Sequence, residues 1–117
     1  MLRLMLSVCL IVLSQDALAA RPEVIVRLKD HLFHPAKVYV PANKKVKLII
    51  VNEDDDPEEF DSFALNREKV VFGQAKANLF IGPLPPGRYP FFGQYHPTTA
   101  QGEVIVLPPG EEVPDAH

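Results

Sequence analysis

The chain has 117 residues, 47% of them hydrophobic, and a formal net charge of −3 at pH 7. This length and apolar content suit one domain with a single core. The only basic cluster is Lys44, Lys45 and Lys47, and the rest of the sequence is mildly acidic. We therefore expect a single domain with no nucleic-acid partner.

The first residues have the organisation of a secretory signal peptide. A basic residue, Arg3, precedes an apolar run over 4–13, and the small-x-small triplet Ala-Leu-Ala follows at 17–19. We expect residues 1–19 to be removed and the mature protein to be secreted. The apolar run is too short to span a bilayer comfortably, so no retained membrane anchor is expected.

This predicted leader contains all the sulfur atoms of the chain, in Met1, Met5 and Cys9. The mature protein would therefore form no disulfide and offer no thiolate or thioether to a metal. Because the leader carries one basic residue, Arg3, and one acidic residue, Asp16, the net charge stays at −3 after its removal.

The remaining sequence is typical of short strands separated by turns. Alternating or β-branched apolar runs predict strands at 24–28, 38–40, 45–51, 69–72, 78–81, 88–92 and 103–107. Proline- and glycine-rich turns separate them, and only 63–66 suits a single helical turn. Twelve prolines among about seven short strands favour a small antiparallel β-sandwich. We place this domain at 20–108, followed by a flexible tail at 109–117.

The mature sequence lacks the motifs of the common enzyme classes. It has no glycine-rich phosphate loop, no nucleophile elbow and no cysteine, and Ser62 has no neighbours that would activate it. Carboxylates and histidines remain, and these are the ligands of imidazole–carboxylate metal sites.

The best histidine candidate is His96. It lies in a loop between an aromatic strand that ends at Gly93 and a β-branched strand that begins at Glu103. A loop held at both ends by strands fixes the direction of its side chains, which favours a ligand role. The alternative is a histidine that only packs on Tyr95 and Pro97.

The other histidines favour a simpler interpretation. His31 and His34 have an x-His-x-x-His spacing in the loop KDHLFHPAK, which is weak evidence for a site, and we interpret them as surface residues. His117 is the last residue and should be exposed to solvent.

Six carboxylates occur within seven residues at 53–59. The four at 53–56 precede Pro57, and we expect them in a hydrated turn that at most attracts cations. After Pro57 the chain should be extended, which points Glu58 to one side and Glu59 to the other. Glu58, at the rim of the core, is the better ligand.

Two more acids are weaker candidates. Glu59 would be a ligand of a second site, a partner of the first ligand, or a surface acid. Glu68 precedes a predicted strand and is an additional candidate, with a surface ion pair to Arg67 or Lys69 as the alternative.

Several segments resemble the cupredoxin family. YPFFGQYHPTTAQGEVIV resembles its last hairpin, and VNEDDDPEEF resembles the segment that carries its first histidine. More narrowly, PEEFDSFALNREKVVFG, IGPLPPGRYPFFGQYHPTTAQGEVIV and FHPAKVYVPANKKVKLIIVN resemble the EfeO-type cupredoxin-like domain, which is secreted and encoded beside bacterial iron permeases. The resemblance implies an all-β, cupredoxin-like Greek-key sandwich. It also implies a role in iron transport, with an iron permease or another membrane component of iron uptake as partner.

At most of the positions where cupredoxins have copper ligands, this sequence has a different residue. Glu58 falls where the first histidine would be, Gly93 near the cysteine, His96 near the second histidine, and Ala100 or Gln101 near the methionine. A type 1 blue-copper site needs the thiolate, so this protein should not be a blue electron carrier.

The altered set of ligands suits a different metal chemistry. An imidazole with one or two carboxylates suits Cu(II), Fe(II), Fe(III) or Zn(II). We expect a copper or iron ion, or both, bound through His96 and Glu58, with Glu59 and Glu68 as helpers. With the iron handling that the family resemblance implies, the expected role is to bind Fe(II) in the periplasm or to oxidise it in a copper-dependent reaction. The alternatives are a periplasmic copper chaperone and a metal-free β-sandwich that acts as an interaction module.

Overall fold

The computed structural model describes residues 21–114, and their regular structure consists of β-strands alone. The predicted signal peptide and the last three residues lie outside this range. Within this range nine strands follow one another: β1 (Glu23–Lys29), β2 (Leu32–His34), β3 (Lys37–Pro41), β4 (Val46–Asn52), β5 (Glu58–Ser62), β6 (Arg67–Val71), β7 (Lys76–Ile81), β8 (Gly87–Gly93) and β9 (Gln101–Leu107). The predicted all-β class is confirmed.

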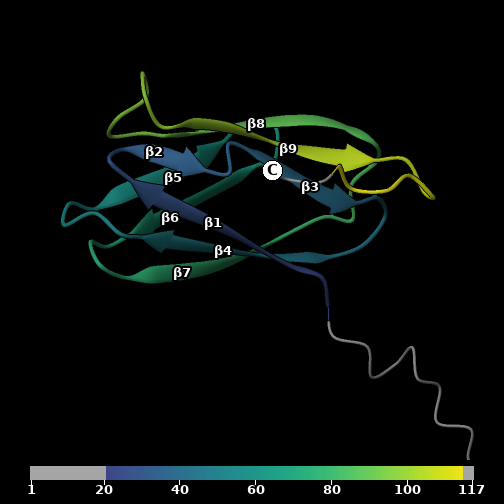
Figure 1. The fold of residues 1–117 in the computed structure, drawn as a ribbon, viewed down its shortest axis with the longest axis horizontal. Helices are drawn as coiled ribbons and strands as arrows, with labels where there is room; N and C mark the ends of the chain where they lie inside the picture. The colour runs from purple at the N-terminus through teal and green to yellow at the C-terminus, as the bar shows by residue number, and fades with distance from the viewer. Residues whose placement is uncertain (1–20, 115–117) are drawn as a thin grey trace, which may run out of the picture.

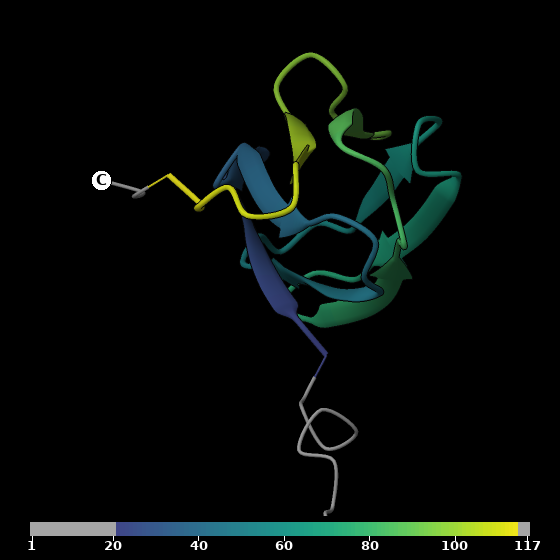
Figure 2. The ribbon, with the colours of Figure 1, turned by 90° about the vertical axis from the view of Figure 1, so that its right-hand side faces the viewer.

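The strands form two sheets that face each other (Figures 1 and 2). One sheet has four strands in the order β2-β1-β4-β7, and the other has five in the order β3-β9-β8-β5-β6. The turn between β1 and β2, the start of β5 and the loop between β8 and β9 lie at the same end of the sandwich (Figure 1). This end carries the residues of the candidate site.

The expectation of an antiparallel sandwich is wrong for two pairs of strands. β1 pairs with β4 in parallel, and β3 pairs with β9 in parallel. Parallel neighbours require a crossover, which here is the passage of the chain through the opposite sheet between the two partners. Turn residues in the sequence show where the chain reverses, but they do not show which sheet receives the next strand.

The core lies between the two sheets and follows the alternation of the strands. In β4, Val46, Leu48 and Ile50 are buried, while the residues between them are only partly buried. Phe60 and Phe91 meet with ring centroids 4.9 Å apart, and Phe33 contacts both rings edge-on. Such aromatic pairs add about 0.5–1.5 kcal/mol each beyond their buried area, so this cluster anchors β2, β5 and β8 to one another.

Two of the nine strands were not predicted from the sequence, β2 and β5. β2 has only three residues, and β5 reads EEFDS, which lacks apolar alternation. Residues 63–66, which suited a single helical turn, form a turn that is not helical. Residues 109–114, the described part of the predicted tail, contain no strand.

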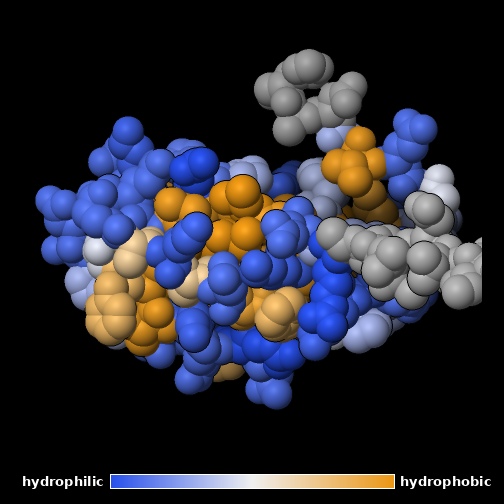
Figure 3. All heavy atoms as spheres, turned by 90° about the horizontal axis from the view of Figure 1, so that it is seen from below, coloured by the Kyte–Doolittle hydropathy of each residue, from blue (hydrophilic) through white to orange (hydrophobic). Residues whose placement is uncertain are grey.

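The outer face of the four-stranded sheet is partly apolar. Ile25 is 50% exposed on β1 and Phe80 is 38% exposed on β7. The charged ends of Arg21 and Lys45 lie over the ring of Phe80, at 5.5 Å and 4.8 Å from its centroid. Figure 3, a view from below, shows apolar side chains separated by hydrophilic ones on this side of the molecule. Among the described residues, no helix is long and apolar enough to cross a membrane.

Candidate metal centre

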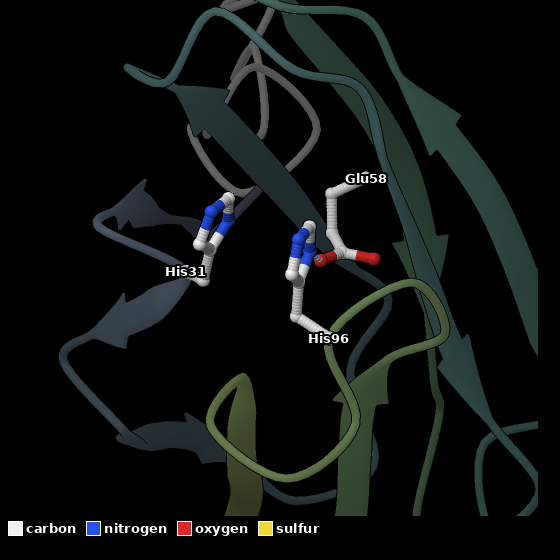
Figure 4. A group of neighbouring side chains, drawn as sticks. All are labelled: His31, Glu58 and His96. Atoms are coloured by element: carbon white, nitrogen blue, oxygen red, sulfur yellow. Dashed lines mark hydrogen bonds and ion pairs between the residues drawn. The ribbon is translucent and has the colours of Figure 1, made fainter.

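Three side chains from distant parts of the chain meet at one end of the sandwich. They are His31 in the turn between β1 and β2, Glu58 at the start of β5, and His96 in the loop between β8 and β9. Each offers a ligand atom, and these atoms all lie within 4.8 Å of one another. Figure 4 shows the two imidazoles side by side, with the carboxylate of Glu58 directed toward His96.

Glu58 is the buried member of this cluster, with only 2% of its surface exposed. Its Oε1 accepts hydrogen bonds from the backbone amides of Tyr95 (2.8 Å) and Glu59 (3.0 Å), and its Oε2 lies 2.7 Å from Nδ1 of His96. We expected Glu58 at the rim, but it lies beneath His96. Three polar partners compensate for the burial of this carboxylate, which would otherwise be costly.

Gly93 makes room for the carboxylate of Glu58. A Cβ atom on residue 93 would lie 2.6 Å from Cδ of Glu58 and 2.8 Å from Cβ of Ala100. Both distances are too short, so Glu58 occupies the space into which any side chain at position 93 would extend. With Glu58 in place there is no room for a cysteine here, and residues 21–114 contain neither cysteine nor methionine. The site does not suit type 1 copper.

Backbone hydrogen bonds close the loop that carries His96. The amide of Gly93 donates to the carbonyl of Ala100 (2.8 Å), and the amide of Ala100 donates to the carbonyl of His96 (2.9 Å). The amide of His96 donates in turn to the carbonyl of Gly93 (3.2 Å). This tight loop, between two paired strands, fixes the backbone from which the imidazole extends.

Asp54 holds the turn that carries His31. Its two carboxylate oxygens accept hydrogen bonds from the backbone amides of Asp30 (2.8 Å) and His31 (3.0 Å), both of which have positive φ angles. Burial acts to raise the pKa of Asp54, but these two hydrogen bonds, together with electrostatic attraction to His31 and His96, hold the pKa below its ordinary value. We expected Asp54 in a hydrated turn, and the structure instead gives it this fixed position.

The rings of His31 and His96 are stacked, with centroids 3.5 Å apart and planes inclined by 13°. From its sequence, His31 was expected to be a surface residue. Its contact with His96 was missed because the x-His-x-x-His spacing relates His31 only to His34, which is exposed. The lone pair of an imidazole nitrogen lies in the plane of its ring. In two nearly parallel rings the lone pairs therefore point along parallel planes and do not converge on one point. A single ion bound by both imidazoles therefore requires one ring to tilt.

The contact between His96 and Glu58 allows two metal-binding arrangements. When Nδ1–H of His96 donates to the ionised carboxylate, Nε2 keeps the free lone pair, and Glu58 orients a histidine ligand from behind. Alternatively, both groups turn toward one ion, and Glu58 is itself a ligand. The residues present fit a metal ion bound by nitrogen and oxygen in either arrangement.

Glu59 and Glu68, the two weaker candidates, lie elsewhere. They form a second group with Asp61, in which one carboxylate oxygen from each lies within 4.8 Å of the others. Burial raises the pKa of Glu59 and of Asp61, and the charges of neighbouring carboxylates raise both further. Asp61 was not singled out from the sequence.

Comparison with known proteins places this architecture in a family. Residues 2–106 match the family described as the cupredoxin-like domain. The chain belongs to this family. The cupredoxin-like chain is also 49% identical, over 84 residues, to an uncharacterized protein of Rickettsia prowazekii (strain Madrid E), covering 72% of this chain and 67% of that protein.

Solved structures similar to this cupredoxin-like chain include several copper proteins. Auracyanin A, described as a "blue" copper protein from Chloroflexus aurantiacus, has a TM-score of 0.65 at 11% identity, covering 75% of this chain and 100% of that one. The metal-binding domain of the Cu(I)-exporting ATPase CopA of Streptococcus pneumoniae has a TM-score of 0.62 at 11% identity, covering 74% and 85%. Amicyanin from Paracoccus versutus has a TM-score of 0.57 at 20% identity, covering 78% and 87%. These structural similarities support the assignment of a cupredoxin-like fold.

Proposed function

We propose that this protein is a secreted, periplasmic member of the EfeO type that acts in high-affinity iron uptake. It binds Fe(II), or supports its oxidation, for a membrane permease. The observation that carries this proposal is the cluster of His31, Glu58 and His96, in which two imidazoles and one buried carboxylate lie at the end of a cupredoxin-like sandwich.

The ligand types of this cluster favour particular ions. Nitrogen and oxygen ligands without sulfur suit Cu(II), Fe(II), Fe(III) and Zn(II), and they favour Cu(II) over Cu(I) and Fe(III) over Fe(II). Copper is the metal named for the similar auracyanin and CopA structures, so it is the first ion to test. The absence of thiolate and thioether ligands from residues 21–114 speaks against a Cu(I) chaperone.

The histidines of this cluster are exposed enough for a bound ion to pass to a partner protein. The side chains of His31 and His96 are 36% and 30% exposed, whereas that of Glu58 is 2% exposed. An ion held by the imidazoles would therefore be reached from solvent, while the buried carboxylate supplies negative charge from below. This arrangement fits delivery of an ion to a membrane permease.

If the protein supports oxidation, four Fe(II) ions each lose one electron and become Fe(III), and one dioxygen takes up these four electrons and four protons from solvent to give two water molecules. Bound copper would supply the one-electron relay between them. The contribution of the chain is to hold the imidazole and carboxylate groups in a nitrogen–oxygen environment that stabilises the higher oxidation state of a bound ion.

Titration with Cu(II), followed by electron paramagnetic resonance, tests the site. We expect a tetragonal copper signal without intense blue absorption, and its loss in His96→Ala and Glu58→Ala. His34→Ala is the matched control, because it removes an exposed histidine just beyond the turn that carries His31. A signal that survives both substitutions would rule out the site.

Iron and the rival functions need separate measurements. Competition among Cu(I), Cu(II), Fe(II) and Fe(III) distinguishes an iron-uptake protein from a copper chaperone, which would prefer copper throughout. Measuring the oxidation of Fe(II) in air by the copper-loaded protein tests whether the protein supports iron oxidation. If none of these ions raises the melting temperature, the metal-free interaction module is the better explanation.

A further inference from the structure

The second carboxylate cluster lies on the outer face of the five-stranded sheet. Glu59 and Asp61 are two residues apart on β5 and therefore point to the same side, while Asp61 is paired directly with Glu68 on β6. Glu58, between Pro57 and Glu59, points to the opposite side and belongs to the histidine site. The two groups are thus separated by the sheet itself.

Asp61 is an unusual residue for a sheet surface. It is 8% exposed, and its Oδ1 is buried without any hydrogen-bond partner. On one side it is opposite Glu68, and on the other it is opposite Phe92 of β8, whose ring contacts Phe63. A buried carboxylate oxygen without a partner is costly, and like charges directly opposite one another on adjacent strands are destabilising.

Neighbouring donors do not relieve this cost. The hydroxyl of Ser62 donates to the carbonyl of Pro90 (2.7 Å). The guanidinium of Arg67 donates to the carbonyls of Phe80 (2.9 Å) and Asn66 (2.9 Å). Within residues 21–114, none of the three clustered carboxylates forms an ion pair. The group therefore has negative charge that the described part of the chain leaves uncompensated.

A pocket of about 400 Å³ opens beside this group. Its lining residues are Asp61, Ser62, Phe63, Asn66, Arg67 and Glu68. Oxygens bound to one cation at about 2.0–2.6 Å lie roughly 3–5 Å from one another, and the carboxylate oxygens here lie within 4.8 Å. Solvent in the pocket would supply the remaining ligands of a bound ion.

We propose that Glu59, Asp61 and Glu68 form a second cation site, which takes a hard, oxygen-preferring ion such as Mn²⁺, Ca²⁺ or Mg²⁺. The main observation behind this proposal is that Oδ1 of Asp61 is buried without a hydrogen-bond partner. A site built only of carboxylates suits hard cations, whereas the imidazoles of the first site suit copper and zinc. The proposal is independent of a role in iron uptake, because it rests on different residues on the other face of the sheet.

Paramagnetic broadening by Mn²⁺ of the amide signals of ¹⁵N-labelled protein tests this site. We expect the amides of Asp61, Ser62 and Glu68 to broaden before that of Tyr95, which lies at the histidine site. Asp61→Asn and Glu68→Gln should each abolish the early broadening. Glu68 is exposed, so its substitution should not impair folding. Asp56→Asn is the matched control, because it removes the same charge from the exposed acidic loop.

Two results would overturn the proposal. One is broadening spread over the acidic loop and unchanged by Asp61→Asn and Glu68→Gln. The other is no broadening, which would mean that the carboxylates relieve their repulsion by sharing a proton. His96→Ala should leave the Mn²⁺ effect intact, so this site and the histidine site can fail separately.

Discussion

The imidazole of His31 lies flat against that of His96, with ring centroids 3.5 Å apart, and His96 in turn contacts the buried carboxylate of Glu58 at 2.7 Å. The three groups form a continuous row from solvent to the core. In this row, the stacked ring of His31 either serves only as packing or supplies a second nitrogen ligand.

Substitution of His31 separates these two roles. His31→Phe keeps an aromatic ring to stack on His96 but removes the nitrogen. We expect it to leave the melting temperature nearly unchanged and to weaken Cu(II) binding at least about tenfold, since even groups that only orient a ligand have effects of this size. Isothermal titration with Cu(II) measures the change. Undiminished affinity in His31→Phe would show that His31 is not a ligand.

Substitution of Gly93 tests whether the carboxylate needs the space beside it. The added Cβ in Gly93→Ala would collide with Glu58 and Ala100, so we expect a loss of about 1–3 kcal/mol in the free energy of unfolding. The loss should be smaller in a Glu58→Ala background, because one of the two collisions is then gone. Urea denaturation of the four proteins in this cycle measures the coupling, and strict additivity would contradict the proposed role of Gly93.

Asp54→Asn tests the contact that fixes the turn of His31. Against the opposing effect of burial, hydrogen bonds and electrostatic attraction to His31 and His96 hold the pKa of Asp54 below its ordinary 3.8. The stabilising effect of Asp54 is therefore present above that pH and is lost as the pH falls through the folded-state pKa. We expect the variant to be less stable at pH 7 by about 1.5–3 kcal/mol, the usual size for hydrogen bonds to a charged group.

Urea denaturation at several pH values measures this effect. The difference between Asp54→Asn and the natural protein should shrink below pH 3.8. Asp56→Asn, which removes a charge from the exposed part of the same loop, should show little change at any pH. Equal effects of the two substitutions would show that only the charge of the loop matters.

Asp61→Asn should change the stability in the direction opposite to Asp54→Asn. Burial, together with the charges of Glu68 and Glu58, raises the pKa of Asp61 above its ordinary 3.8. Stability is then complete below pH 3.8 and is lost as the pH rises through the folded-state pKa. In the presence of a chelator we expect Asp61→Asn to be more stable at pH 7, by about 0.2–1 kcal/mol for relief of the cross-strand repulsion.

The pH dependence of the melting temperature checks this expectation. The gain in Asp61→Asn should disappear below pH 3.8, where the natural carboxyl group is protonated. If the variant is less stable at pH 7, the carboxylate has a stabilising partner and the cluster is not under strain.

Local patterns in the sequence were sufficient to predict most of the strands and two of the residues of the candidate site. β-branched alternation and turn residues predicted seven of the nine strands, because the period of a strand is a property of consecutive residues. The same alternation placed Glu58 and Glu59 on opposite faces of β5, as the structure has them. The loop around His96, held between two strands, could also be recognised from the sequence.

Tertiary structure alone decided which side chains meet. His31 reaches His96 because β1 and β8 lie in facing sheets whose turns come to the same end of the sandwich, a relationship that no local spacing encodes. Asp61 acquires its buried, unpartnered oxygen only because β6 and β8 cover it from both sides. The sequence by itself thus determined most of the strands and the types of ligand available, and the packing of the two sheets decided how those ligands are grouped.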